Sequence, residues 1–290
     1  MFSKRPDSFD YTLMRHCRTC SHQFTGRYCP RCGEKVFDEK DRSLKHYVSD
    51  LFNAFTFIDG KFFRSFRTLV AMPGKMSQDF VNGIRQPYMK PIALFFVANF
   101  LYFLFPFFQT FNTAFYFQAN AMPYSDIAQQ IIAKKLESSA YDAAQLETVY
   151  NVSSTNWAKM LLILLVVYLL PVLTLVNYHR RVYVLDHLAF TLEFMTFLLF
   201  VPTLIFGTTL WTIVAIGRWF GVDLTVILAD KVASPFVVIF LLYFLLHGIR
   251  RFYNFPWWRT VLNSMLLICA LILVLMLYRF TLFLITITTI

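Results

Sequence analysis

The sequence has few charged residues. Asp, Glu, Lys and Arg make up 15% of its 290 residues, against about 25% in an ordinary soluble domain. Apolar residues make up 57% and aromatic residues 19%, with 34 Phe among them. Because a soluble core cannot enclose this much apolar surface, lipid must cover part of it. The composition therefore predicts an all-α polytopic membrane protein.

Several signatures of activity and targeting are also missing. The sequence contains no HExxH pair, no phosphate-binding loop and no Ser/His/Asp arrangement. Its first 40 residues hold no apolar run of the kind that forms a signal peptide. No internal repeat suggests the inverted halves of many transporters. We therefore expect no particular reaction, and a membrane-embedded enzyme is the least favoured class.

Cysteine is scarce, at five residues, yet four of them lie within sixteen positions: Cys17, Cys20, Cys29 and Cys32. Two CxxC pairs place two thiolates each on tight turns, and together they complete a tetrahedral metal shell. Gly33 supplies the backbone freedom that the second turn needs. The short spacer allows almost no core, so the metal must supply most of the folding energy. Residues 1–42 are predicted to form a small zinc ribbon and a linker.

The ligand set favours one structural zinc ion, because four cysteines leave no open coordination position. Two alternatives stay open at this stage: a redox or disulfide set, and iron in a rubredoxin-like site. Disulfides are disfavoured because a cytoplasmic site is reducing. His16 and His22 lie beside the ligands and are interpreted as bystanders.

Residues 43–90 are predicted to form amphipathic helices at the membrane interface. Ser43 can cap a helix over residues 44–58, and a second, basic helix is expected over 61–70. A third short helix is expected from Ser77 onward, after the break at Pro73–Gly74. Their alternation of Phe or Leu with basic residues suits the headgroup layer.

Residues 91–290 are predicted to form a bundle of about five transmembrane helices. The expected spans are 91–111, 158–177, 184–216, 232–249 and 260–278. Residues 112–157 form an extracytoplasmic loop with helices at 125–137 and 142–150, and a kink is expected at Pro171. The apolar tail 280–290 is expected either to extend the last helix or to lie along the membrane.

The distribution of charge predicts the orientation. Residues 1–90 hold 16 Lys or Arg and 9 Asp or Glu, a net +7, whereas the loop 112–157 is net −2. The positive-inside rule then places the N-terminus in the cytoplasm and the C-terminus on the other side of the membrane. Anionic lipid headgroups are the expected partners, and nucleic acid is not. The basic interface residues are Lys61, Arg64, Arg67, Arg180, Arg181, Arg250, Arg251 and Arg259.

Glu193 is unusual for a membrane helix. It lies about nine residues, or ~13 Å, into the third span, where a carboxyl needs a partner or an inward orientation. Asn99 lies at a comparable depth, Asp186 and His187 lie at the cytoplasmic mouth, and Thr191 shares a face with His187. Two interpretations remain: a polar pocket or proton path, and hydrogen-bonded packing between helices.

The order of these motifs resembles a known family. The two CxxC pairs are followed by Thr68-Leu69 and Pro73-Gly74, then by a G-x-R-x-P-Y-x-x-P segment over residues 83–91 that enters a Phe-rich helix. This pattern resembles a family of uncharacterised membrane proteins with an N-terminal zinc ribbon, common in the Bacteroidota. Residues 186–194 are similar to that family's third-helix motif, where the resemblance implies a His in place of Glu193.

The favoured hypothesis is a membrane scaffold or binding protein whose cytoplasmic ribbon recruits or senses a cytosolic protein. The alternative is a transporter or lipid-handling protein with a polar pocket around Glu193 and Asn99. The family resemblance implies topology and zinc, and it implies no mechanism.

Overall fold

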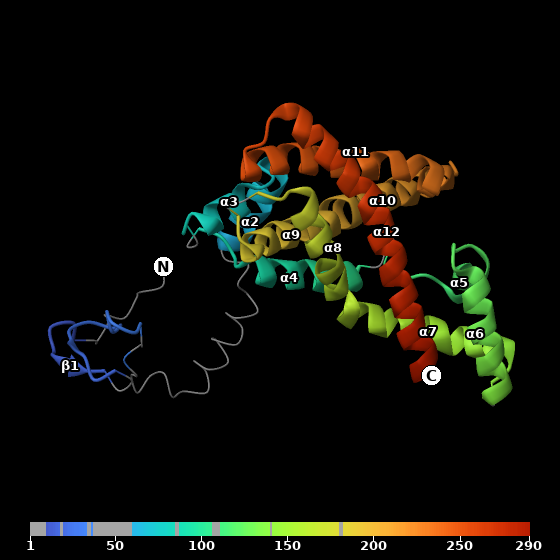
Figure 1. Cartoon of the computed structure of the whole chain (residues 1–290), viewed down its shortest axis with the longest axis horizontal. Coiled ribbons are helices and arrows are strands. Elements are labelled where there is room, and N and C mark those ends of the chain that lie inside the picture. Colours follow the sequence, from blue (N-terminus) through green and yellow to red (C-terminus); the bar gives the residue numbers. More distant parts are fainter. Residues whose placement is uncertain are drawn as a thin grey trace. The chain divides into compact units, whose positions relative to one another are not determined.

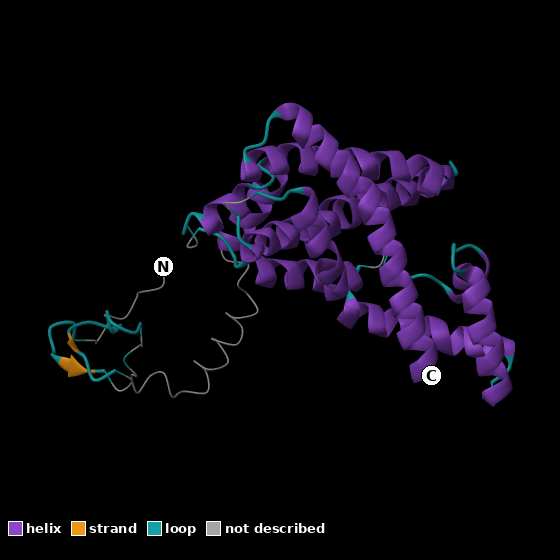
Figure 2. Cartoon of the chain, in the orientation of Figure 1, coloured by secondary structure: helices purple, strands orange, loops and turns teal. Residues whose placement is uncertain are grey.

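The computed structural model describes residues 10–17, 20–33, 36, 60–84, 87–105, 111–139, 141–179 and 182–290. The chain divides into two compact units, Met1–Asp59 and Gly60–Ile290. Among the described residues, the strands belong to the first unit and the second unit is helical (Figures 1 and 2). The predicted helix over 44–58 lies outside the described residues.

The first unit is built around a short hairpin. Strand β1 (Arg15–His16) pairs antiparallel with β2 (Gln23–Phe24), with Arg15 opposite Phe24. Its buried apolar core consists of Cys17, Phe24 and Cys29. A core of this size is far below what stabilises an independent domain, so a cross-link or a metal is needed to hold it.

The second unit is a bundle of helices that begins with two short ones and ends with the longest. Its elements are α2 (Gly60–Ala71), α3 (Lys75–Val81), α4 (Pro91–Leu104), α5 (Phe115–Asn120), α6 (Ser125–Ser138), α7 (Ala143–Leu161), α8 (Ile163–Val176), α9 (Val184–Leu198), η2 (Leu199–Ile205), α10 (Phe206–Trp219), η3 (Thr225–Leu228), α11 (Asp230–Tyr253) and α12 (Trp257–Thr289). The predicted basic helix over 61–70 corresponds to α2.

Helix α9 lies at the centre of the bundle. It packs against α3, α4, α8 and α11, and every residue from Ala189 to Leu198 is buried. A helix that is buried on all sides usually has an almost continuously apolar sequence. Because α9 has no contact with water there, the polar residues Thr191, Glu193 and Thr196 must have hydrogen-bond partners inside the protein.

Three helical segments among the described residues are long and apolar enough to cross a membrane: Val184–Trp219, Lys231–Tyr253 and Trp257–Thr289. The bent pair α7 and α8 makes a fourth if it counts as one span. Helix α4 is apolar but has only 14 residues, about 21 Å at 1.5 Å per residue. The protein is therefore a helical membrane protein, but the predicted count of about five spans is not confirmed.

The second predicted span differs from expectation. Residues 142–150 were expected in a separate loop helix, whereas α7 runs without interruption from Ala143 to Leu161. Asp142 caps it with a capping box that includes Gln145. The chain then bends by 53° between α7 and α8, at Leu162 rather than at Pro171. Pro171 lies inside α8.

The third predicted span continues to Trp219 and contains a π-helical segment, η2, at its centre. Pro202 lies within this segment and has no backbone N–H to donate. The Thr203 hydroxyl donates to the carbonyls of Leu198 and Leu199, which compensates for part of the disturbed backbone pattern. The proline expected inside this helix thus shifts its hydrogen-bond register and does not end it.

The apolar tail extends the last helix and does not form a separate segment. The helix continues to Thr289, so residues 280–289 extend the predicted fifth span. Phe283 and Ile287 of this extension form a second apolar cluster with Ala128, Leu146 and Tyr150 from α6 and α7. We call this arrangement of α5, α6, the start of α7 and the end of α12 the C-terminal cap (Figure 1).

Candidate metal centre and buried carboxylate

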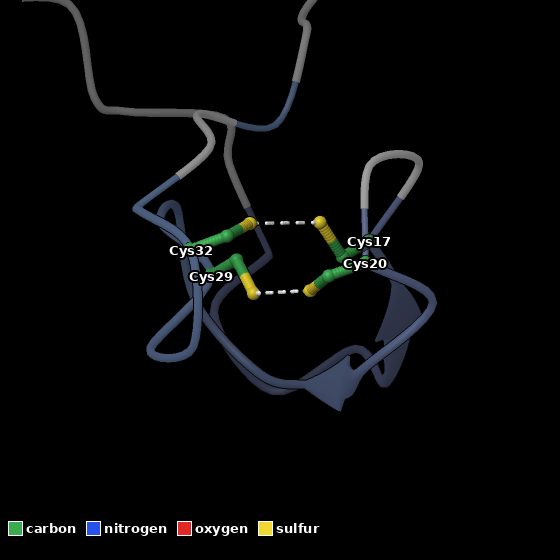
Figure 3. A group of neighbouring side chains, drawn as sticks. All are labelled: Cys17, Cys20, Cys29 and Cys32. Carbon is green, nitrogen blue, oxygen red and sulfur yellow. Dashed lines mark hydrogen bonds between the residues drawn. The ribbon is translucent and has the colours of Figure 1, made fainter.

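The four predicted cysteine ligands lie together in the first unit. Their sulfur atoms are all within 4.8 Å of one another. Cys17 and Cys32 are 3.4 Å apart and Cys20 and Cys29 are 3.6 Å apart, across the gap between the two turns (Figure 3). All four are free thiols, since a disulfide requires about 2.05 Å.

Two turns of the same construction carry the cysteines. In the first, Ser21 N–H donates to the Cys17 carbonyl, and Ser21 has a φ of 56°. In the second, Gly33 N–H donates to the Cys29 carbonyl, and Gly33 has a φ of 76°. The left-handed residue after each pair turns the chain so that both thiols face inward, which confirms the need for backbone freedom at Gly33.

The environment of Cys29 favours its thiolate. Burial of this side chain opposes ionisation, but hydrogen bonds from the backbone of Cys32 and Arg31 and from neighbouring thiols outweigh it and lower the pKa of Cys29 to about 7. Thiolate is the form that binds metal.

The cluster fits a tetrahedral metal ion. Zn–S bonds of ~2.3 Å imply sulfur separations of about 3.8 Å, close to the two distances above. Four thiolates suit zinc and iron alike. The cluster can therefore hold a metal ion, and the sulfur set by itself leaves the identity of the metal open.

The buried carboxylate of Glu193 finds its partners on α3. Its side chain is 2% exposed. Oε1 accepts a hydrogen bond from the Gly74 N–H at 2.9 Å, and Oε2 accepts one from the Ser77 N–H at 2.8 Å and another from the Ser77 hydroxyl. Glu193 thereby satisfies N–H groups that the start of a helix leaves without partners.

The α2–α3 turn also approaches α11 closely. Gly74 has a φ of 77°, and a Cβ placed there would lie 2.7 Å from the carbonyl oxygen of Gly248. Arg251 donates to the Pro73 carbonyl at 2.6 Å, and Gln78 donates to the Arg251 carbonyl at 3.2 Å. The turn is therefore held by α9 and α11 together, through a contact that only glycine permits.

Asn99, His187 and Thr191 do not join Glu193 in one pocket. Asn99 donates to the Lys159 carbonyl at 3.2 Å. His187 Nδ1 shares a hydrogen bond with the Tyr253 hydroxyl at 2.7 Å. Thr191 donates to the His187 carbonyl at 2.8 Å, so the expected pairing involves the backbone of His187 and not its ring.

Asp186 makes contacts of its own, separate from those of Glu193 and Asn99. Its carboxylate accepts the Tyr183 N–H at 3.0 Å at the start of α9. It also lines a cavity of about 140 Å³ between α3, α9 and α11. The lining residues are Gln78, Val81, Asn82, Val182, Asp186 and Phe252. The polar residues predicted as one site are thus distributed over separate contacts.

The predicted basic residues have different surroundings, and Arg251 makes the contact with Pro73 described above. Lys61, Arg64 and Arg67 are exposed on α2. Arg250 lies over the Trp257 ring at 5.4 Å and Arg259 over the Phe255 ring at 3.8 Å, so both rest on aromatic faces. Arg180 and Arg181 lie outside the described residues.

Sequence reasoning missed Gly74, Ser77 and Gly248 as partners in one contact. From the sequence, Pro73-Gly74 indicates a break in the chain and forms part of the family pattern, and Ser77 indicates the start of a helix; neither motif indicates a contact with Glu193. The carboxyl of Glu193 could have indicated such a contact, because a carboxyl in an apolar helix needs hydrogen-bond donors from other segments of the chain.

The fold and the cysteine cluster define a class: a helical membrane protein with an N-terminal four-cysteine cluster able to hold a metal ion. A family model described as a protein of unknown function (DUF3667) matches residues 59–103. The matched segment includes α2, α3 and most of α4, and so contains Gly74 and Ser77. No curated protein and no solved structure matches the chain.

Proposed function

We propose that this chain is a scaffold or binding protein of a bacterial inner membrane, whose N-terminal unit holds one structural zinc ion and recruits or senses a cytosolic protein. The observation that carries this proposal is the surface of the first unit. Leu13, Met14 and Tyr28 are 53%, 64% and 61% exposed, although the apolar core of this unit is minute. Large apolar side chains that a small unit leaves exposed favour contact with a partner.

Zinc is the preferred metal because the four sulfur atoms close the coordination shell. A closed shell suits a structural role, whereas a catalytic zinc keeps a position for water or substrate. The metal would fix the two turns and thereby the exposed side chains between and beside them.

The arrangement of charged residues supports the orientation. Arg250, Arg251 and Arg259 gather at the junction of α11 and α12, and Arg259 donates to the Tyr178 carbonyl near the end of α8. The α2–α3 turn contacts Arg251 as well. All these groups belong to one end of the bundle, which the positive-inside rule assigns to the cytoplasm. The opposite end of α12 then lies outside.

Metal analysis combined with co-purification tests the proposal on the full-length protein. The wild type is expected to carry one zinc per chain and to retain a cytosolic protein after crosslinking in cells. Cys29→Ser should lose both, because its shell is incomplete, while it still inserts into the membrane. Cys269→Ser, which removes a cysteine on α12, is the matched control and should lose neither. Met14→Ser should keep the zinc and lose the partner.

Two results would contradict the proposal. Full zinc content in Cys29→Ser would show that the ligand set is wrong. A partner that Cys29→Ser and Met14→Ser retain would show that the first unit does not recruit it.

A transporter or lipid-handling protein with a site around Glu193 is the second candidate, and it has less support. Both oxygens of the carboxylate already accept hydrogen bonds from α3. A ligand would have to displace the start of that helix before it reached Glu193. The cavity beside Asp186 is the observation in favour of this candidate.

A further inference from the structure

The cavity beside Asp186 is large enough for a small organic group. Its volume is about 140 Å³, and it is partly open to the surface. One water molecule needs only ~10–15 Å³, so the cavity has room for a group of several non-hydrogen atoms. Glu193 is not among the lining residues, because its carboxylate is enclosed by the start of α3. The cavity is therefore a location distinct from Glu193.

Three side chains of the cavity have oxygen atoms that can still accept a hydrogen bond. Asp186 Oδ2 accepts the Tyr183 N–H at 3.0 Å, whereas Oδ1 accepts none within the described part of the chain. Gln78 Nε2 donates to the Arg251 carbonyl, which leaves Gln78 Oε1 as an acceptor. Asn82 is exposed, and its side-chain amide forms no hydrogen bond with a described residue. The cavity thus matches a ligand that supplies hydrogen-bond donors.

The charge of the cavity is negative. Asp186 alone among the six lining residues is charged. The guanidinium of Arg251 donates to the Pro73 carbonyl at 2.6 Å, and that of Arg250 lies over the Trp257 ring, so both have partners outside the cavity. The full charge of the carboxylate also exceeds the partial charge of about +0.5 at the start of α9. A cation is therefore favoured over an anion.

The apolar part of the wall favours an organic cation over a metal ion. Val81, Val182 and Phe252 line the cavity and supply no side-chain oxygen, whereas a calcium ion takes about six to eight oxygen ligands. An aromatic ring attracts an organic cation, and apolar side chains suit the methylene groups next to its charge. A primary ammonium group has three N–H donors, one for each of the three side chains that have a free oxygen.

The cavity lies at the depth where two membrane-spanning segments end. The segment Val184–Trp219 begins two residues before Asp186, and the segment Lys231–Tyr253 ends one residue after Phe252. Spanning helices end in the headgroup layer of the membrane. The ammonium groups of phospholipid headgroups are therefore available at this depth.

We propose that this cavity binds a primary ammonium group, supplied by the headgroup of phosphatidylethanolamine or by a free amine. The Asp186 carboxylate pairs with the ammonium, and the side-chain oxygens of Gln78 and Asn82 accept its other N–H groups. Phe252 contacts the carbon atoms next to the charge. All the lining residues belong to the second unit, so the site does not depend on the metal or on the function proposed for the first unit.

Lipid titration of the full-length protein in detergent, followed by native mass spectrometry, tests the proposal. Phosphatidylethanolamine is compared with phosphatidylcholine and phosphatidylglycerol of the same acyl chains, which have no ammonium N–H, and ethanolamine is titrated in parallel. We expect the wild type to prefer phosphatidylethanolamine by about tenfold or more, as one hydrogen bond to a charged group provides. Asp186→Asn should remove this preference. Its amide oxygen can still accept the Tyr183 N–H, so α9 should stay folded.

Asp126→Asn is the matched control. Asp126 also lies in the first turn of a helix, α6, and it is exposed and does not line the cavity. This variant should keep the wild-type preference. Val81→Trp provides a second test that leaves Asp186 intact. Val81 is 41% exposed, so the indole can fill the cavity from its open side without disturbing the core, and ammonium binding should be lost while the Tm stays the same.

The outcomes separate the two sources of the ammonium group from failure of the proposal. A preference for phosphatidylethanolamine that Asp186→Asn removes supports the lipid. Ethanolamine binding that depends on Asp186, with no preference among the lipids, would retain the ammonium site and exclude the lipid as its source. Equal binding of both compounds to the wild type, Asp186→Asn and Val81→Trp would overturn the proposal. Phosphatidylcholine binding with the same dependence on Asp186 would show that N–H donors are not recognised, which contradicts a primary ammonium ligand.

Discussion

Gly74 and Gly83 share a left-handed backbone conformation but differ in their surroundings. Their φ angles are 77° and 84°. A Cβ at Gly74 would lie 2.7 Å from the Gly248 carbonyl oxygen, whereas a Cβ at Gly83 would meet nothing within 4 Å. An atom of backbone cannot move aside as the end of a flexible side chain can. The glycine requirement at position 74 therefore combines backbone conformation with tertiary contact.

We expect Gly74→Ala to destabilise the protein by several kcal/mol more than Gly83→Ala. Both variants carry the cost of a left-handed non-glycine residue, about 1 kcal/mol, and Gly74→Ala adds the clash with α11. Thermal unfolding of both variants in the same detergent measures the difference. Equal effects of the two substitutions would show that the approach of residue 74 to Gly248 has no energetic importance.

At the scale of elements, Glu193 connects the α2–α3 pair to the centre of the bundle. The pair was expected to lie in the headgroup layer, and its basic side chains on α2 are indeed exposed. Its other face is buried: Ser65, Thr68 and Leu69 are each at most 4% exposed. Because three donors at the start of α3 point at one carboxylate, α3 is attached to α9 by polar contacts deep in an apolar environment. This geometry favours the packing interpretation of Glu193 over a polar pocket.

Glu193→Gln should loosen α3. An amide offers one acceptor oxygen and places an NH₂ group against the donors of Gly74 or Ser77, so at least one buried N–H loses its partner, at about 1–3 kcal/mol. Hydrogen exchange of residues 60–84 should become faster, while exchange in α12 stays the same. Glu147→Gln, at an exposed position on α7, is the control. Unchanged exchange in Glu193→Gln would mean that the carboxylate does not hold the helix.

At the scale of the whole molecule, the two ends of α12 have different surroundings. Trp257, Trp258 and Arg259 begin the helix beside Arg250 and Arg251, whereas its far end packs in the C-terminal cap with α6 and α7. If the basic end faces the cytoplasm, the cap faces the other side of the membrane.

Cysteine labelling of intact cells tests this orientation. A membrane-impermeant maleimide should label Ser138→Cys, on an exposed position of α6, and should label Tyr178→Cys only after the cells are permeabilised. Tyr178 is 64% exposed, so its protection would result from the membrane and not from burial in the protein. Labelling of Tyr178→Cys in intact cells would reverse the proposed orientation.

The sequence alone determined those features that depend on composition and short spacing. Low charge and abundant Phe predicted membrane helices, two CxxC pairs predicted the four-cysteine cluster, and the alternation in residues 61–70 predicted α2. Each of these signals is a property either of the overall composition or of residues close together in the sequence, so none of them depends on which distant segments pack together.

Only the tertiary structure decided what Glu193 contacts. The sequence suggested Asn99 as a partner of Glu193 because both lie at a comparable depth in the membrane. The hydrogen-bond donors come instead from Gly74 and Ser77, more than a hundred positions away in the sequence. Depth along a helix does not indicate which neighbouring element covers a given face of that helix. The same reason explains the bend at Leu162 instead of Pro171 and the course of the tail. Both depend on packing against other helices. The sequence of an apolar run is equally apolar whether the helix bends within it or continues through it, so the run itself does not indicate which occurs.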